Sequence, residues 1–164
     1  MSKANQWMAT MHVKGSSQGV FQDDGSWAGK DRTRCAAVRF RGEVPHDVRD
    51  GKYVAARNHP VSVLHEWTPA TVQFVQALWS NEVLDEVVLY FRRPDGKGSE
   101  EDFATLTLTK ATVAYAELTT GHADAIEGDH RQMCDVGLHA EKMEFKLKAA
   151  GGQLTASYDR SKTS

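Results

Sequence analysis

Alternation of apolar and polar side chains indicates that most of this chain is β-strand. A period of two with one polar face is typical of a half-buried strand. One nearly continuous apolar stretch, residues 83–92, is typical of a strand that is covered on both faces. Loops rich in Gly, Pro, Asn and Asp separate the segments. The strands predicted in this way are residues 7–14, 34–41, 60–67, 83–92, 103–118, 132–148 and 153–158.

Two long segments change phase along their length. In residues 103–118 the apolar positions shift from even to odd between Leu108 and Val113, and residues 132–148 shift after Leu138. A phase change within one strand predicts a bulge or a sharp bend. Bent strands favour a closed or nearly closed antiparallel barrel, which also removes exposed sheet edges. The pattern therefore predicts a mainly β fold, an antiparallel β-barrel of about seven to eight strands.

One helix interrupts the strands, between residues 67 and 83. Thr68 is suited to be its N-cap and Pro69 its first residue, and Asn81 tolerates the left-handed cap at its end. Burial of one large apolar side chain contributes roughly 1.5–3 kcal/mol as an upper estimate. We therefore expect an apolar stripe of the helix to pack on the barrel: Val72, Val75, Leu78 and Trp79, widened by Phe74.

Length and loops predict one domain, residues 1–164, with a loose polar tail at residues 159–164. Two long polar stretches, residues 15–33 and 42–58, read as loops. Loops of this length inside a compact domain are usually functional or disordered.

Composition narrows the function classes. The chain is 40% hydrophobic and 26% charged, as in an ordinary soluble globular protein, and its net charge is −2. The near-zero charge gives no support to a nucleic-acid partner, and copies of the chain repel one another little. No apolar run approaches the roughly 18–20 residues of a membrane span, and no apolar core of a signal peptide is expected near the N-terminus.

The cysteines are Cys35 and Cys134. Two cysteines so far apart favour free thiols in a reducing compartment, and a disulfide between them is the alternative. A nucleophile pair of Cys134 with His130 or His139 is disfavoured. On a strand, residues five apart face opposite sides, and residues four apart lie about 13 Å from each other.

The sequence gives only weak evidence for a metal site or a catalytic motif. His122, Asp124, Glu127, Asp129 and His130 crowd one loop and could ligate a divalent metal, but a solvated acidic loop is favoured because no regular element orders them. The zinc-protease, nucleophile-elbow, phosphate-loop and dinucleotide motifs are absent. We therefore expect no enzyme, no metal and no cofactor. A set of aromatic residues is expected in the core and not as a base-stacking platform: Trp67, Phe74, Trp79, Tyr90 and Phe91.

At this point the sequence resembles the Hcp proteins, the tube-forming components of type VI secretion systems. The segments that carry the resemblance span nearly the whole chain: HVKGSSQGVF at 12–21, Pro45 through RNHP at 57–60, FVQALWSNEVLDEVVLYFRRP at 74–94, TLTLTKATVAYAEL at 105–118 and MEFKLKAAGGQLTASYD at 143–159. The order and spacing of these segments are more specific than any one of them. Departures such as HEWTPAT before the helix leave the subfamily open.

The resemblance implies a small β-barrel with one helix that assembles into a six-membered ring. Stacked rings would form a hollow tube that a contractile sheath propels out of a Gram-negative bacterium, with small effectors in the lumen. It implies the sheath, spike and baseplate as partners, with no nucleic acid and no membrane insertion. The chain would assemble in the cytoplasm and be secreted through the machine without a signal peptide.

Ring contacts are expected in residues 15–33 and 42–58. The second stretch is the main candidate for stacking one ring on the next, and its alternative is a disordered surface loop. Mixed charge and an aromatic ring there suit complementary contacts. The residues proposed for it are Pro45, Asp47, Arg49, Asp50, Lys52, Tyr53 and Arg57. Three other readings stay open: a monomeric ligand-binding barrel, a metal hydrolase built on residues 122–130, and a phage-like tail tube subunit.

Overall fold

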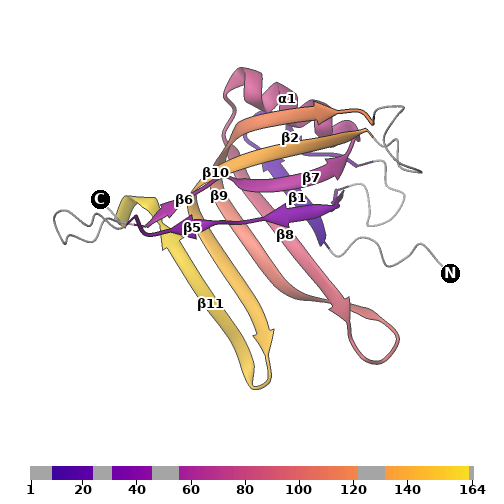
Figure 1. The fold of residues 1–164 in the computed structure, drawn as a ribbon, viewed down its shortest axis with the longest axis vertical. Coiled ribbons are helices and arrows are strands. Elements are labelled where there is room, and N and C mark those ends of the chain that lie inside the picture. Colours follow the sequence, from indigo (N-terminus) through magenta and orange to yellow (C-terminus); the bar gives the residue numbers. More distant parts are fainter. Residues whose placement is uncertain (1–8, 24–30, 46–55, 122–131, 163–164) are drawn as a thin grey trace.

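The computed structural model describes residues 9–23, 31–45, 56–121 and 132–162. These residues form a mainly β fold with one α-helix, as predicted (Figure 1). The elements, in chain order, are β1 (Ala9–Gly15), β2 (Gly19–Val20), β3 (Thr33–Cys35), β4 (Ala37–Arg39), β5 (Gly42–Glu43), β6 (Arg57–Asn58), β7 (Val61–Glu66), α1 (Pro69–Ser80), β8 (Leu84–Pro94), β9 (Glu100–Thr119), β10 (Met133–Ala149), β11 (Gly152–Asp159) and the 3-10 helix η2 (Arg160–Lys162).

All strand pairs are antiparallel. The main sheet runs in the order β2-β1-β8-β9-β10-β7-β4, with β11 paired to β10 and β3 paired to β1. Figure 1 shows that the sheet folds into two layers. One contains β4, β7, the start of β10 and the end of β9, and the other contains β1, β8, the start of β9, the end of β10 and β11.

The barrel is less closed than the sequence predicts. The predicted strand 34–41 is split: β3 pairs with β1, whereas β4 pairs with β7. Between them the Ala36 N–H donates to the Leu64 carbonyl at 2.7 Å. The split strand bridges the two layers, but each piece has only three residues. In the part of the chain that the structure describes, no ladder therefore joins β4 directly to β1.

The predicted phase changes in β9 and β10 are confirmed, and they occur at the same level. The buried side shifts from even to odd positions near Lys110 on β9 and near Glu141 on β10. Lys110 has a φ of 50°, and its Nζ lies 3.9 Å from Glu141 Oε2. Pairing continues in register on both sides, from Ala140↔Ala111 to Lys142↔Thr109. The two strands thus bend together as one ribbon and pass from one layer to the other.

A β-bulge follows the bend. Gly137 pairs with Tyr115 but Leu138 pairs with Val113, so β9 has one extra residue, Ala114. A Cβ at position 137 would collide with the ring of Tyr115, which lies across the glycine. Glycine is therefore required here by space.

The ends of α1 are as predicted. Thr68 has extended backbone, its hydroxyl accepts from the Ala70 N–H, and the Thr71 hydroxyl accepts in return from the Thr68 N–H. Pro69 is the first helical residue, and Asn81 takes the left-handed conformation with a φ of 58°. These caps satisfy helix-end groups that have no partner within the helix.

The expected apolar stripe of α1 is wrong in part: Phe74 is buried and Leu78 packs against the core as predicted, but Val72 and Trp79 do not. Val72 is 71% exposed and Trp79 is 78% exposed, whereas Ala70, Phe74 and Ala77 are buried. Small alanines on the inner face let the helix approach the sheets closely. The sequence pattern of large apolar residues could not reveal this, because alanine carries little hydrophobic signal.

The core lies between the layers and beneath α1. Phe74 meets Phe21 edge to face, with 5.0 Å between ring centroids, and lies 5.6 Å from the ring of His65 on β7. The helix thus closes one end of the space between the layers. The largest fully buried side chains are Phe21, Phe74, Met11, Leu84, Leu89, Leu108, Leu138, His65, Val13, Val61, Val63 and Val87.

Of the remaining sequence predictions, one is confirmed and two are wrong in part. Cys35 and Cys134 are buried free thiols, as predicted. Trp67, which was expected in the core with Trp79, is 44% exposed. The predicted loops 15–33 and 42–58 contain short strands, because β2, β5 and β6 fall within them.

Candidate assembly surface

A two-stranded ribbon projects from the body of the molecule (Figure 1). We call residues 41–45 and 56–59 the arm. Gly42 pairs with Asn58 and Glu43 with Arg57, and the His59 N–H donates to the Arg41 carbonyl at 2.9 Å.

The arm contains part of the predicted stacking site. Pro45 and Arg57 lie within the arm, beside the ends of β5 and β6. Asp47, Arg49, Asp50, Lys52 and Tyr53 fall outside the described residues. The site as a whole therefore stays a prediction.

The arm carries several charged side chains. Glu43 accepts a hydrogen bond from Arg41 at 3.1 Å, and its other oxygen lies 3.3 Å from His59 Nε2. The hydrogen bond with His59, helped by the charge of Arg41, holds the pKa of the Glu43 carboxyl below its usual range. All three side chains are largely in solvent, where ion pairs contribute little to stability.

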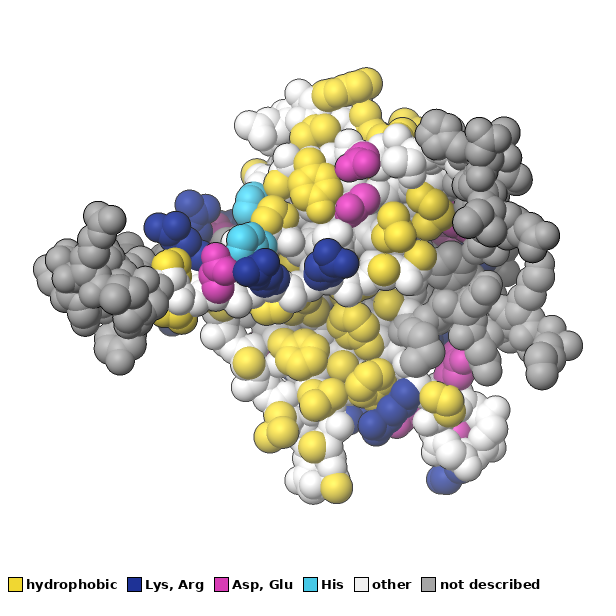
Figure 2. All heavy atoms as spheres, viewed as in Figure 1, with side chains coloured by type: hydrophobic (Ala, Val, Ile, Leu, Met, Phe, Trp, Pro, Cys, Tyr) yellow, Lys and Arg dark blue, Asp and Glu magenta, His cyan; other side chains and the backbone are white. Residues whose placement is uncertain are grey.

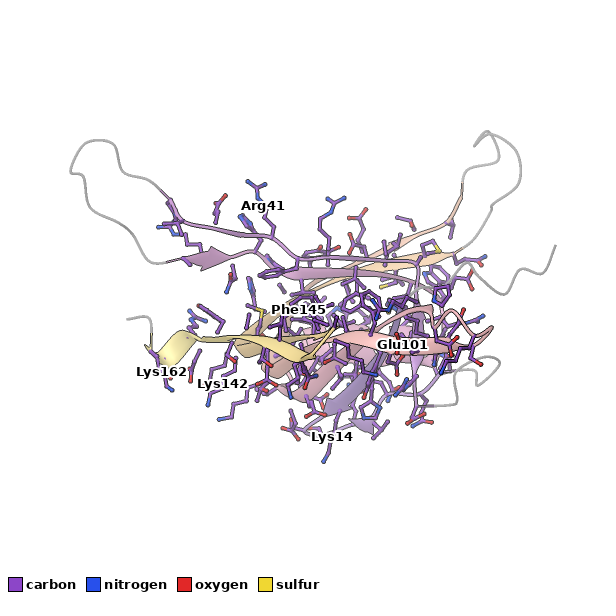
Figure 3. The ribbon with its side chains drawn as sticks, turned by 90° about the horizontal axis from the view of Figure 1, so that it is seen from below. Lys14, Arg41, Glu101, Lys142, Phe145 and Lys162 are labelled. Carbon is purple, nitrogen blue, oxygen red and sulfur yellow. The ribbon has the colours of Figure 1, made fainter. Side chains whose placement is uncertain are left out.

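An apolar groove of about 440 Å³ opens between the arm and the layer that contains β8 to β11. Phe40 and Phe145 line it and are 50% and 42% exposed. Figure 3 shows Phe145 in the space between the two layers, and Figure 2 shows hydrophobic side chains gathered below the arm. The lining residues are Val38, Phe40, Asn58, Phe91, Leu106, Met143, Phe145, Ala156, Ser157 and Tyr158.

The strand β11 forms an edge beside this groove. Within the described residues it pairs with β10 alone, and it contains no Lys, Arg or Pro. Its apolar Leu154 is 64% exposed and lies on the same side of the strand as Ala156 and Tyr158, which line the groove. Natural edge strands are usually shielded by charges, proline or covering segments. The outer edge of β11 is therefore ready to pair with another strand.

The opposite face of the same layer is polar. Thr105, Thr107 and Thr109 form a row on β9, and Lys146, Glu144 and Lys142 pair with them on β10. Lys146 Nζ lies 3.0 Å from Glu144, and Lys142 Nζ lies 3.6 Å from Asp159. This face presents hydroxyl groups and paired charges, with few large apolar side chains.

The buried thiol of Cys134 and the buried imidazole of His65 do not form a nucleophile pair. Cys134 pairs across the ladder with His65, a neighbour that sequence reasoning missed. Burial, helped by the charge of Asp135, raises the pKa of the Cys134 thiol to about 11, and burial lowers the pKa of His65 to about 4. Both groups are therefore neutral near pH 7, unlike the thiolate and imidazolium of a cysteine nucleophile. Of the two partners weighed from the sequence, His139 is exposed and His130 lies outside the described residues.

The structure does not test whether the acidic loop holds a metal, the reading that the sequence disfavours, because residues 122–131 are not described. Among the residues that are described, no three His, Cys, Asp or Glu side chains group as metal ligands. None of the helices described there has the length and apolar character to cross a membrane.

The groove and the β11 edge were both missed at the level of sequence. One signal was available, since QLTASY at 153–158 is a predicted strand without a single charge. The groove had no such signal, because it joins side chains from β4, the arm and four later strands.

Comparisons with known proteins agree on one family. The sequence matches the family described as type VI secretion system effector, Hcp, over residues 8–147. No curated protein matches it.

Solved structures share the fold. A crystal structure titled Hcp protein has a TM-score of 0.82 at 21% identity, covering 92% of this chain and 96% of that one. A mutant of Hcp1 from E. coli EAEC 042 has a TM-score of 0.80 at 15% identity, covering 94% and 99%. Secreted Hcp3 from Pseudomonas aeruginosa has a TM-score of 0.69 at 20% identity, covering 92% and 96%.

Proposed function

The chain belongs to the Hcp family of the type VI secretion system, and we propose from this premise that it acts by joining copies of itself into rings that stack as a hollow tube. It is a structural subunit of the secretion tube. Membership of this family also indicates secretion through the machine and a role that is not enzymatic.

One observation carries the proposal: a strand edge without lysine, arginine or proline, that of β11, lies beside an apolar groove. A second copy could form hydrogen bonds with the edge of β11 through one of its strands, and it could cover the apolar side chains of Phe40, Phe145 and Leu154. A contact between two different surfaces repeats head to tail and closes into a ring when the rotation fits an integer. For this family the integer is six.

The ring orientation follows from the two faces of the β8–β11 layer. We assign the polar face with Thr105, Thr107 and Thr109 to the lumen. Its hydroxyl groups and paired charges keep this face hydrated, so it would bind cargo only weakly. Small effectors are the proposed cargo, and the sheath, spike and baseplate are the proposed partners outside the tube and at its ends.

Stacking of one ring on another is assigned to the arm and the residues that follow it. The proposed contacts remain those of the sequence prediction: Pro45, Asp47, Arg49, Asp50, Lys52, Tyr53 and Arg57. Support comes from the arm itself, which projects from the body and carries Arg57 at its end.

A substitution at the free edge tests ring formation. Wild-type protein in size-exclusion chromatography with light scattering should have a mass several times 18.2 kDa, and electron microscopy should show six-fold annuli. Burial of the exposed part of Leu154 should stabilise each contact by about 1–2 kcal/mol. Leu154→Lys loses that contribution and places a charge at the contact, so we expect a particle of single-chain mass.

The matched control is Gln153→Lys, which adds the same charge on the other face of the same strand. It should keep the ring. Wild-type protein that stays monomeric at every concentration would reject the proposed function. Rings that persist unchanged in Leu154→Lys would reject the β11 edge as the contact.

A further inference from the structure

The outward face of α1 is apolar and has no charge. Residues 67–83 contain one charged side chain, Glu82, which is buried and lies after the helix. A surface helix normally turns charged and polar side chains to solvent, whereas a helix without a charged face is typical of an element that is covered. We call the exposed apolar side chains of this face and of the residues directly after it, Val72, Trp79 and Val83, the ridge. Figure 2 shows hydrophobic side chains at the top of the molecule, over α1.

Trp79 is the main side chain of the ridge. It is the most exposed large apolar side chain in the part of the chain that the structure describes. An aromatic side chain buries roughly 150–250 Å² when it is covered. Tryptophan is also one of the residue types that dominate binding energy when they enter a pocket of a partner. The ridge therefore has the composition of one half of a protein contact.

The apolar groove between the arm and the β8–β11 layer has a matching composition. No Lys, Arg, His, Asp or Glu lines it, although the chain is 26% charged. Its volume of about 440 Å³ lies within the roughly 300–1,000 Å³ of pockets that enclose small ligands, so it has room for an indole ring. Placing the ridge in the groove would remove apolar surface from water on both sides without stripping water from a charged group.

The ridge and the groove lie at different ends of the molecule. Figure 1 shows α1 at the top and the β10–β11 hairpin at the bottom, with β7 and the arm between them. One copy therefore cannot place its ridge in its own groove. Insertion into a second copy leaves a free ridge at one end of the pair and a free groove at the other, so the contact repeats head to tail.

A strand edge accompanies each of these two surfaces. β11 lies beside the groove, and β2 begins the strand order of the main sheet, where it pairs with β1 alone among the described residues. The segment that contains β2 lies along α1, because Gln18 Nε2 donates to the Gln73 carbonyl at 2.9 Å and the Gln22 N–H donates to Gln73 Oε1 at 2.8 Å. A copy that presents its ridge to a groove therefore also presents β2 on the side where β11 lies.

We propose that the ridge of one copy fills the apolar groove of the next copy in the ring, with Trp79 packed against Phe145. The inference rests on the proposed function, because it requires a ring. It names the surface that completes the head-to-tail contact begun by β11 and the groove. Sequence reasoning placed Trp79 in the core of its own subunit, and here the indole becomes buried in the core of a contact between two subunits.

Paired cysteine substitutions test the contact directly. Cys35 and Cys134 are buried, so introduced thiols should react selectively. Gln76→Cys on the outward face of α1 and Ala156→Cys in the groove keep every large apolar side chain of the contact. In one full-length chain, a short bis-maleimide should join this pair between copies, and a denaturing gel should show a ladder of covalent multimers. The matched control combines Gln76→Cys with Thr107→Cys on the polar face of the same layer, and it should give no ladder.

Substitution of Trp79 measures how much the ridge contributes. Trp79→Ala should raise the protein concentration at which half of the chains form rings about tenfold or more, because truncation of a central tryptophan is among the costliest changes at a contact. Trp79→Phe should restore part of the loss. Light scattering over a dilution series measures the rings, and circular dichroism should show the β fold intact in both variants, since the indole is largely exposed in the single chain.

The outcomes separate this inference from the proposed function. Wild-type protein that forms no rings would reject the proposed function itself. Three results obtained with intact wild-type rings would each overturn the assignment of the ridge to the groove: no ladder from the cysteine pair, a ladder confined to stacked tubes, or assembly of Trp79→Ala at the wild-type concentration.

Discussion

Glu82 offers a sharp test of how the fold is held together. It follows α1, is buried, and accepts three hydrogen bonds: from the Ser17 N–H at 2.7 Å, the Gln18 N–H at 2.9 Å and Gln18 Nε2 at 2.8 Å. The carboxylate thus fastens the turn between β1 and β2 to the end of the helix. Gln18 Nε2 also donates to the Gln73 carbonyl at 2.9 Å, which extends the connection into α1.

The substitution Glu82→Gln keeps the shape and removes the charge. Hydrogen bonds to a charged group contribute roughly 1.5–3 kcal/mol each, and neutral ones roughly 0.5–1.5 kcal/mol. The new amide also turns donor hydrogens toward Gln18 Nε2, which is itself a donor. Relief from burying a charge offsets part of this loss. We therefore expect the free energy of unfolding to fall by about 2 kcal/mol.

The effect should depend on pH in a defined direction. Burial alone would raise the pKa of Glu82, but the hydrogen bonds from Gln18 and Ser17 outweigh it and the pKa is lowered from 4.5. The stabilisation is therefore fully present above the unfolded value and is lost as pH falls through the lowered folded value.

Urea unfolding followed by tryptophan fluorescence, at about pH 7 and about pH 3, would measure the difference. Protein concentration must be matched, because assembly adds to apparent stability. The control is Glu86→Gln, which makes the same charge change at an exposed position on β8. A loss no larger than that of the control at about pH 7, or a loss that persists undiminished under acid, would refute the reasoning.

Two further perturbations address the core and the stacking site. His65 has a pKa of 6.5 in the unfolded chain and about 4 in the folded one, so the wild type should lose up to about 3 kcal/mol of stability as pH falls between these values. Urea unfolding midpoints measured over this range should fall less steeply with pH in His65→Leu than in the wild type. The exposed control His59→Leu should keep the wild-type dependence. Deletion of residues 47–55 should abolish stacked tubes in electron micrographs while circular dichroism shows the β fold intact, and tubes that survive the deletion would reject these residues as the stacking site.

Local patterns were sufficient for much of the fold. The period of two located the long strands, and the phase shifts near Lys110 and after Leu138 revealed bends before any contact was known. The caps of α1 were readable because Thr68, Pro69 and Asn81 act within a few residues of themselves. Each of these signals depends on residues that are close together in the chain, so a single sequence is enough to read it.

Other features depend on tertiary contacts and were misread. The helix turns Ala70 and Ala77 inward and leaves Val72 exposed, and no periodicity of large apolar residues reports this choice of face. Residues 34–41 split into two strands because they reach partners in different layers. At the candidate site, Arg57 was identified from its loop, but Phe40 and Phe145 were not, since only folding brings β4, the arm and the later strands around one groove.

The joint bend of β9 and β10 has a mechanical consequence for a subunit of a secretion tube. Each of these strands is continuous from one layer into the other, and Lys110 and Glu141 mark the level where both turn. Sliding of one sheet over its neighbour would have to stretch covalent backbone, whereas in an ordinary sandwich it need only disturb side-chain packing. A load on one layer is thus transmitted to the other by the chain itself.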